Sequence, residues 1–140
     1  LIFFSGGGSV SYRKNFASYS ISKLALVKLV EIASKEAESR KFRLNIIAPG
    51  NIYSNMTKKI LKKAKYIDII TRKEILKNRK NSEKNLLKIY ELISFLHSTK
   101  GKKISGKLMS SKWDKFQKFN NNDVTKIINS NIFNISRKII

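Results

Sequence analysis

The segment from residue 18 to 39 constrains the fold more than any other part of the chain, because it is a long helical pattern with a wide apolar surface. Its apolar residues are Ile21, Leu24, Ala25, Leu26, Val27, Leu29, Val30, Ile32 and Ala33. A helix with apolar residues on more than one side buries two faces. We therefore expect one face to pack on a sheet of the same chain and the other on a partner.

Strand-like runs flank this helix on both sides. Residues 1–4 are a short continuous apolar run, and residues 42–48 are a second run that stops at Pro49 and Gly50. A continuous apolar run is typical of a strand that is buried on both faces of a parallel sheet. Strand, helix and strand in this order predict a crossover unit of an α/β fold. Residues 104–110 predict the last strand.

Between the second and the last strand the pattern predicts helices of two kinds. Residues 58–65 and 72–79 are short, basic and weakly patterned, so we expect residues 53–80 to form a flap and not part of the core. A stronger helix opens at residues 81–82 and ends near His97, which we interpret as a helix-end residue.

The remainder of the chain follows the last strand. Trp113 begins an aromatic closing segment, residues 120–123 predict a linker, and residues 124–140 form a tail with some helical spacing. We place the end of the main domain at residue 114 and regard residues 115–140 as a C-terminal extension.

Length and composition exclude several classes. A chain of 140 residues suffices for one domain with a core. It contains no cysteine, which excludes disulfides and thiolate metal sites, and its single histidine leads us to expect no metal site. No apolar run approaches the roughly 20 residues of a membrane span. We expect a cytoplasmic protein without a membrane partner.

The charge is extreme: 30 basic and 9 acidic residues give a net charge of +21. Such a charge is typical of proteins that bind nucleic acid or anionic membranes. Here, however, the lysines are spread over most of the chain, without an arginine-rich stripe or interleaved aromatic residues. We favour compositional drift, as AT-rich coding produces, and expect weak, nonspecific and salt-sensitive binding to polyanions.

The glycine run at residues 6–8 follows the first strand. It lacks the spacing and the Lys-Ser/Thr ending of a phosphate-binding loop, and it is not G-x-G-x-x-G. We expect a loop in which the backbone turns sharply or approaches another group closely.

Tyr19 and Lys23 are four residues apart at the start of the long helix, so one turn brings them to the same face. A tyrosine side chain is a poor base at neutral pH because its usual pKa is near 10. A cation a few ångströms away lowers the pKa of a phenol and makes it a usable general acid or base. The spacing therefore allows an acid/base pair.

Four elements in this order together resemble the short-chain dehydrogenase/reductase family, over about residues 1–114. The Tyr-x-x-x-Lys signature of the family is matched by Tyr19 and Lys23, and Ser5 stands at the end of the preceding strand, where the family has its catalytic serine. Residues 44–50 resemble the segment that leads to the Pro-Gly turn of the family, and residues 104–108 resemble its final strand. The resemblance implies a partial Rossmann-like, doubly wound parallel sheet, consisting of the last three strands.

The resemblance also implies an activity and its residues. The chain would belong to an NAD(P)-dependent oxidoreductase that interconverts an alcohol and a carbonyl, with NAD or NADP as cofactor. Tyr19 would be the general acid/base, Lys23 would tune Tyr19 and bind cofactor, and Ser5 would polarise the carbonyl. The implied cofactor-binding residues are Tyr19, Lys23, Pro49, Gly50, Ile52 and Ser54, where Ser54 stands in the place of a threonine that contacts the carboxamide.

The dinucleotide fingerprint, the adenine-side selector and the catalytic asparagine of the family lie upstream of the matched portion, and this chain does not contain them. We therefore expect a C-terminal fragment that neither binds dinucleotide tightly nor turns over by itself. Trp113, Asp114 and residues 131–139 resemble a subgroup associated with sugar and cell-surface polysaccharide gene sets, so a sugar-related small molecule is one expected substrate class. We also expect homo-oligomers through the 18–39 helix.

Two alternatives remain at this point. Besides the oxidoreductase, the chain could be a basic nucleic-acid-binding module. It could also be a non-catalytic, truncated remnant of a short-chain dehydrogenase/reductase. Steep salt-dependent binding with a preference among sequences would favour the first, and a Gly-x-x-x-Gly-x-Gly turn after a strand in the upstream sequence would favour the oxidoreductase.

Overall fold

The computed structural model describes residues 1–6, 8–12, 14–37, 39, 42–50, 52–63 and 67–136. Parts of several predictions fall outside these residues. They are Gly7 of the glycine loop, Asn51 after the Pro-Gly turn, and the ends of the predicted helices and tail at residues 38, 64–65 and 137–140.

Three parallel strands form the sheet, in the order β1 (Ile2–Phe4), β2 (Asn45–Ala48) and β3 (Leu108–Ser110). In the register of the sheet, Phe3 is opposite Ile46 and Ile47 is opposite Met109. The predicted α/β class with a parallel sheet is confirmed, although each strand is shorter than its predicted run.

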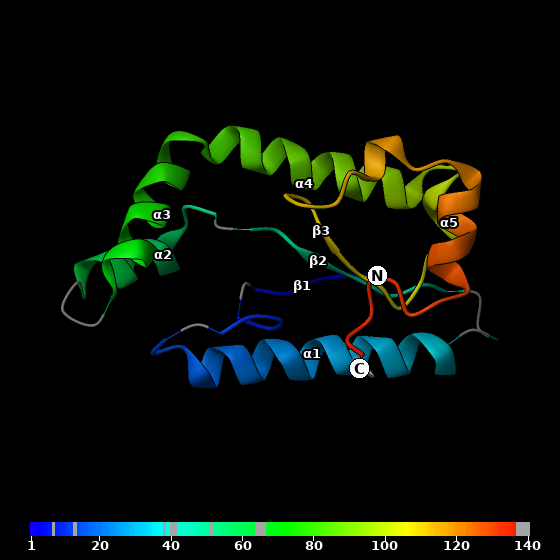
Figure 1. The fold of residues 1–140 in the computed structure, drawn as a ribbon, viewed down its shortest axis with the longest axis horizontal. Coiled ribbons are helices and arrows are strands. Elements are labelled where there is room, and N and C mark those ends of the chain that lie inside the picture. The colour runs from blue at the N-terminus through cyan, green and yellow to red at the C-terminus, as the bar shows by residue number, and fades with distance from the viewer. Residues whose placement is uncertain are drawn as a thin grey trace, which may run out of the picture.

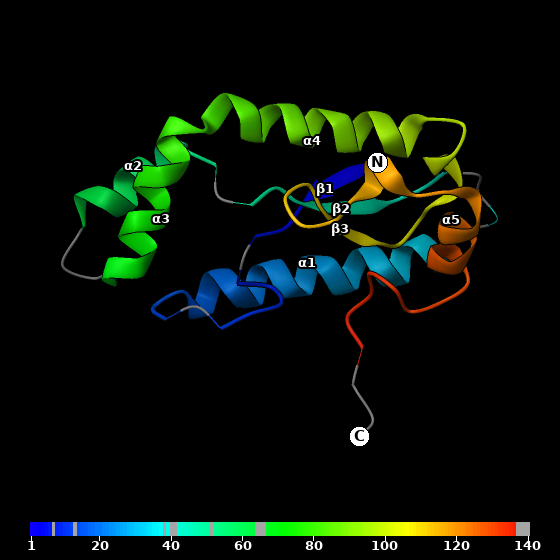
Figure 2. The same cartoon turned by 45° about the horizontal axis from the view of Figure 1, so that its top comes forward.

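Helices surround this sheet in two layers and at its two ends (Figures 1 and 2). They are α1 (Ala17–Glu36), α2 (Asn55–Lys62), α3 (Ile69–Lys80), α4 (Ser82–His97) and α5 (Asn121–Ile128), with short 3-10 turns η3 (Gly101–Lys103) and η4 (Phe116–Lys118). Helix α1 covers one face of the sheet and α4 covers the other, as Figure 2 shows. The described residues thus form a helix–sheet–helix arrangement, which is compatible with part of a Rossmann-like fold.

Two neighbouring isoleucines of β2 show how the strand builds both cores. Ile46 is buried in the cluster on the α1 side, together with Val27 and Val30. Ile47 is buried in the cluster on the α4 side, which includes Leu92 and Leu96. Because successive side chains of a strand point to opposite faces, a strand covered by helices on both sides is apolar at consecutive positions.

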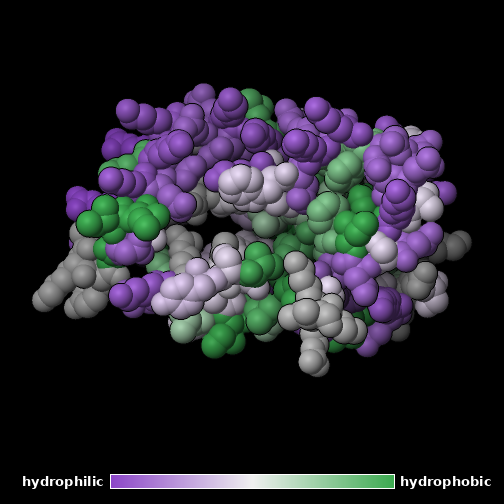
Figure 3. Space-filling model, in the orientation of Figure 1, coloured by the Kyte–Doolittle hydropathy of each residue, from purple (hydrophilic) through white to green (hydrophobic). Residues whose placement is uncertain are grey.

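Only one of the two apolar faces of α1 is buried within this chain. The exposed residues of the other face include Ile21 and Leu29, at 67% and 60% exposure. Hydrophobic surface appears along the edge of the molecule where α1 lies (Figure 3). The sheet-facing half of the prediction is confirmed, and the partner for the second face stays a prediction.

The predicted linker at residues 120–123 is wrong, because these residues begin α5. The Asn120 side chain accepts a hydrogen bond from Asp123 N, and the Asp123 side chain accepts one from Asn120 N, each at 2.9 Å. This reciprocal pair caps the helix, whose Val124 and Ile127 are buried in the core on the α4 side. By contrast, α1 begins at Ala17 after Phe16, which makes no side-chain cap.

Helices α2 and α3 lie beyond the carboxyl ends of the strands (Figure 1). Helix α2 has no buried residue, and α3 buries Thr71 and Ile75. Their assignment to a flap stays a prediction. Within the described ranges, no helix is long and apolar enough to cross a membrane, and no group of three or more metal-ligating side chains is close enough to hold an ion.

Candidate active site

The phenol of Tyr19 lies against the backbone of Gly6. A Cβ atom built on Gly6 would overlap the Tyr19 hydroxyl and would be 2.7 Å from Tyr19 Cζ. Tyr19 is half-buried in the first turn of α1, and its ring meets the Phe16 ring edge-on at a centroid distance of 6.2 Å. The first turn of α1 therefore brings this phenol to the residue that follows Ser5.

Lys23 fixes the same turn of α1 to the end of β1. Its ammonium donates a 2.9 Å hydrogen bond to the carbonyl oxygen of Phe4 and lies 6.0 Å from the centroid of the Tyr19 ring. The i,i+4 spacing places both side chains on the sheet-facing side of the helix. The cation is thus held beside the phenol by a backbone acceptor.

Ser5 is buried at the carboxyl end of β1, with 4% exposure. Its amide donates to Ile47 O at 2.9 Å, which continues the pairing of β1 with β2 by one residue. Its hydroxyl is 2.8 Å from that of Ser9, which itself donates to Gly6 O at 2.9 Å. Sequence reasoning did not select Ser9, because a serine in a polar loop carries no spacing signal.

The close approach expected of the glycine loop is confirmed at two described positions, Gly6 and Gly8. A Cβ atom on Gly8 would overlap the hydroxyl of Ser20 and would be 3.0 Å from Ser20 Cβ. The Ser20 hydroxyl is buried and has no hydrogen-bond partner among the described residues. The loop therefore requires glycine where it passes over α1.

The Pro-Gly turn follows β2 and opens at the same edge of the sheet as Ser5, because the strands are parallel. Gly50 has a φ of +71°, a left-handed conformation that favours glycine. A Cβ atom there would be 3.5 Å from the side chain of Lys112, which follows β3. The carboxyl ends of β2 and β3 thus meet beside this turn.

Ile52 and Ser54 lie between this turn and α2. Ile52 is half-buried, and the exposed Ser54 caps α2: Ser54 N donates to Thr57 Oγ1 at 2.7 Å, and Thr57 N donates to Ser54 Oγ at 3.4 Å. The structure thus brings Ser5, Tyr19 and Lys23 into one cluster around Gly6. It shows no contact that joins Ile52 or Ser54 to that cluster.

Basic side chains lie over aromatic rings at the rim of this edge of the sheet. Lys58 and Arg79 lie 5.7 Å and 5.6 Å from the centroid of the Tyr53 ring. Lys112 lies 4.4 Å from the Trp113 ring, and Trp113 is 74% exposed. The rim at α2, α3 and the end of β3 is therefore cationic and aromatic.

Asp114 follows β3 and is an acid with a shifted pKa. Burial raises the pKa of its carboxyl, and a 2.7 Å hydrogen bond from Ser110 N opposes that rise.

Two cavities lie away from this edge of the sheet. One of about 190 Å³ lies at the amino ends of β1 and β2, and one of about 930 Å³ lies beside the last turns of α1.

A family model described as enoyl-(acyl carrier protein) reductase matches residues 1–111, which is most of the chain. The chain belongs to the short-chain dehydrogenase/reductase family. Neither the curated proteins nor the solved structures give a significant match. The match covers the three strands and helices α1 to α4 of the short-chain dehydrogenase/reductase portion, and it ends before α5. Family membership places the chain among the oxidoreductases, as the resemblance implied.

Proposed function

We propose that this chain carries the proton-transfer half of an NAD(P)-dependent oxidoreductase that interconverts an alcohol and a carbonyl. One observation carries the proposal: the Tyr19 phenol lies on Gly6, next to the buried Ser5, while Lys23 is tied to Phe4 of the same strand. A hydroxyl donor, a phenol and an ammonium around one strand end make up the set that carbonyl reduction requires.

Each side chain has one task in this proposal. In reduction, the Tyr19 phenol gives its proton to the carbonyl oxygen as that oxygen becomes an alcohol. The Lys23 ammonium stabilises the phenolate that remains, and the Ser5 hydroxyl donates a hydrogen bond to the same substrate oxygen. In oxidation the phenolate takes the alcohol proton back. Hydride transfer is the chemistry that the nicotinamide supplies when bound.

Ser9 sets the direction of the Ser5 hydroxyl. Because the Ser9 hydroxyl donates its one hydrogen to Gly6 O, the hydrogen between the two serines belongs to Ser5. The Ser5 hydroxyl must then turn from Ser9 to the substrate oxygen during the reaction. Ser9 thus accepts the hydrogen bond of the Ser5 hydroxyl when no substrate is bound.

The chain fits the nicotinamide end of the cofactor better than its phosphates. The orphaned, buried Ser20 hydroxyl and the glycines that crowd Tyr19 and Ser20 line the edge at which Pro49 and Gly50 also turn. Pro49, Gly50, Ile52 and Ser54, with Tyr19 and Lys23, would hold the cofactor from this side. We see no glycine-rich turn into a helix N-terminus for a pyrophosphate among the described residues, so we propose that the isolated chain binds dinucleotide weakly.

The substrate is a small molecule with an alcohol or carbonyl, and a sugar-related compound is one candidate class. The description of the matched family names a second class, enoyl groups on acyl carrier protein. The experiment is a panel assay on the intact protein, with NADH and NADPH, simple aldehydes and ketones, keto-sugars and an enoyl thioester, followed at 340 nm. We expect oxidation of one cofactor with at least one carbonyl.

The outcomes separate the alternatives. Turnover only with the enoyl thioester would replace the alcohol/carbonyl assignment. No turnover and no cofactor binding by the intact protein would favour the non-catalytic remnant. Sequence-selective nucleic-acid binding that persists at moderate salt would favour the basic module over compositional drift. For the isolated chain, micromolar NAD(H) or NADP(H) binding in calorimetry would contradict the weak-binding proposal.

A further inference from the structure

A groove of about 930 Å³ lies at the edge of the sheet opposite to the candidate active site. It is lined by the last turns of α1, by Arg43 before β2, by Gly106 and Lys107 before β3, and by residues 128–136. Because the strands are parallel, the amino ends of β2 and β3 lie at one edge of the sheet and Ser5 lies at the other. The cluster around Gly6 therefore does not account for this groove.

The lining of the groove is cationic. Five of its side chains are basic, whereas Glu31 is the one acid among them. The basic residues come from α1, from the segment before β2 and from η3 and the segment after it, and they are Lys28, Lys35, Arg43, Lys103 and Lys107. Folding thus gathers cations that lie far apart in the sequence, and a cleft with one sign of charge attracts ligands of the opposite sign.

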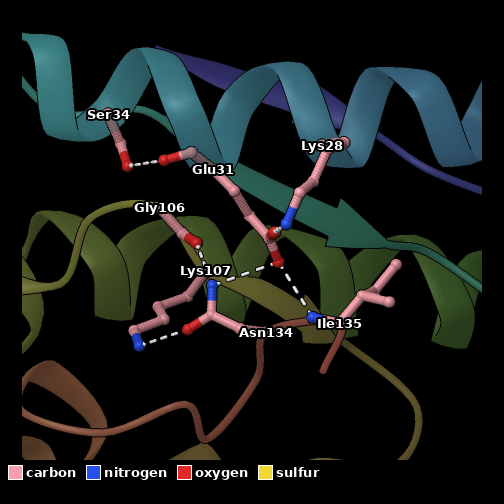
Figure 4. A network of polar contacts seen from close by, with 7 residues as sticks. All are labelled: Lys28, Glu31, Ser34, Gly106, Lys107, Asn134 and Ile135. Carbon is pink, nitrogen blue, oxygen red and sulfur yellow. Dashed lines mark hydrogen bonds and ion pairs between the residues drawn. The ribbon is translucent and has the colours of Figure 1, made fainter. Parts of the chain in front are cut away.

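Glu31 offsets only one of these five charges (Figure 4). Its Oε2 pairs with the Lys28 ammonium at 3.0 Å. Its Oε1 accepts hydrogen bonds from Ile135 N at 2.9 Å and from Asn134 Nδ2 at 3.1 Å. Both carboxylate oxygens are therefore already engaged, and four cations of the lining keep an excess of positive charge.

The Lys107 ammonium lies close to a second ammonium of the groove. Lys107 is 5% exposed, and it donates to two neutral acceptors, Asn134 Oδ1 at 2.6 Å and Ser130 O at 2.7 Å. Burial lowers the pKa of Lys107, a change that nearby Glu31 opposes and Lys35 reinforces. Lys35 and Lys107 thus repel each other, and a bound anion would relieve this repulsion.

Several donors of the groove are uncommitted within the part of the chain that the structure describes. Lys35 and Lys103 are exposed and make no hydrogen bond or ion pair there. Arg43 donates through Nη1 alone, to two backbone carbonyl oxygens, so its other N–H groups are uncommitted. The Ser105 hydroxyl accepts from Leu44 N at 3.2 Å and can still donate its own hydrogen. Such donors suit phosphate oxygens.

Apolar side chains line the same groove. Phe42 is 46% exposed, and Ile32 and Ile128 are exposed beside it in the lining. Sites for small molecules typically combine apolar surface with a few polar groups in a volume of about 300–1,000 Å³. The groove therefore suits a molecule with an anionic part and a flat apolar part.

We propose that this groove binds a small molecule with two or more phosphate groups and a flat apolar ring, the chemistry of a nucleoside diphosphate or triphosphate. The phosphates lie among Lys35, Lys103 and Arg43, and the ring packs on Phe42. The proposal rests on the lining of the groove and not on the proposed oxidoreductase activity, whose cofactor would lie at the opposite edge of the sheet.

Calorimetry of the intact protein tests the proposal, with ATP as the probe in about 0.15 M salt without divalent cations. We expect one ATP per chain, with an affinity at least about 10-fold lower in the double variant Lys35→Gln/Lys103→Gln. The matched control is Lys73→Gln/Lys77→Gln, which removes the same charge from exposed positions of α3, away from the groove (Figure 1). We expect the control to change the affinity less than about 2-fold.

Two further measurements locate the ligand. Phe42→Ala should weaken ATP binding about 5-fold and leave the affinity for inorganic triphosphate unchanged, because only ATP has a ring to pack there. In NMR spectra, ATP should shift the amide signals of residues 103–107 and leave those of Ser5 and Gly6 unchanged. A urea midpoint of Lys35→Gln/Lys103→Gln that is no lower than that of wild type would show that this variant folds normally.

Four results would overturn the proposal. Absence of ATP binding is the first, and an equal loss of affinity in the two double variants, which would mean that ATP responds to net charge alone, is the second. The third is a set of NMR shifts at Ser5 and Gly6 in place of residues 103–107, which would put ATP at the cofactor position. The fourth is equal weakening of ATP and triphosphate by Phe42→Ala, which would remove the ring from the ligand class.

Discussion

The phenol oxygen of Tyr19 occupies the space that a Cβ atom on Gly6 would need. The neighbour that such an atom meets is the far end of a side chain that can rotate. At Gly101 the situation is the opposite, because a Cβ atom there would overlap the carbonyl oxygen of Phe95 and lie 2.9 Å from its carbonyl carbon. A backbone group cannot move aside at similar cost.

This contrast predicts different effects for two chemically identical changes. Gly6→Ala should displace the Tyr19 phenol and lower kcat of the intact enzyme about 100-fold, with a small effect on the free energy of unfolding. Gly101→Ala should lower the free energy of unfolding by about 1–3 kcal/mol. Urea titration measures the free energy of unfolding of each variant, and an assay of cofactor oxidation at 340 nm measures its kcat. Full activity of Gly6→Ala would mean that the Tyr19 phenol, in the position the structure gives it, does not transfer the proton.

Ser9→Ala tests whether Ser9 acts through Ser5. The change removes the acceptor that holds the Ser5 hydroxyl, but leaves Ser5 able to contact the substrate. We expect kcat to rise about 2- to 10-fold with an unchanged KM, because the Ser5 hydroxyl no longer has to leave Ser9, and we expect Ser9→Thr to keep the wild-type rate because it keeps the acceptor. Equal kcat values for Ser9→Ala and wild type would show that the 2.8 Å contact does not influence the reaction.

Much of this fold could be predicted from the periodicity of apolar residues. The cluster around Gly6 could be predicted from the order and spacing of Ser5, Tyr19 and Lys23 along the chain. The apolar runs located three strands, and the helix spacing placed Tyr19 and Lys23 on one face. Residues 120–123 misled because asparagine and aspartate favour linkers and helix caps alike, and the capping pair is recognised only when the buried Val124 and Ile127 follow. The contacts of Asn134 depend on a segment that folds back from far along the sequence, and those of Ser9 depend on the conformation of the loop after β1, so no periodic pattern predicts either.

The Glu31 carboxylate gives the protein a pH dependence at the acid end. Burial alone raises the pKa of Glu31, but hydrogen bonds from Ile135 N, Lys28 and Asn134 outweigh burial and hold the pKa below its usual range. The unfolded chain therefore takes up a proton at higher pH than the folded one. The stabilisation is present above about pH 4.3, the usual value for glutamate, and is lost as pH falls below it through the folded pKa.

We accordingly expect the urea midpoint to fall between about pH 5 and 3 in wild type, and to fall less in Glu31→Gln. Glu36→Gln is the matched control, because Glu36 is an exposed glutamate on the same helix. If the urea midpoint of Glu31→Gln falls with pH as steeply as that of wild type, other carboxylates cause the pH dependence of stability.

The exposed apolar face of α1 predicts a homo-oligomer of the intact protein. Leu29→Glu, at a side chain that is 60% exposed, should shift the protein toward monomer in sedimentation velocity. Leu86→Glu on α4 is the control, at 51% exposure. A wild-type protein that is monomeric at high concentration would remove α1 as an interface.

The most direct measurement is single-turnover cofactor oxidation by Tyr19→Phe in the intact protein, with a substrate that the panel assay has identified. Tyr12→Phe is the matched control, since Tyr12 is 88% exposed. If Tyr19 transfers the proton, the loss of its hydroxyl should slow the step about 10²–10⁴-fold at a saturating concentration of cofactor. A Tyr19→Phe rate equal to that of Tyr12→Phe would contradict the assignment of Tyr19 as the general acid/base.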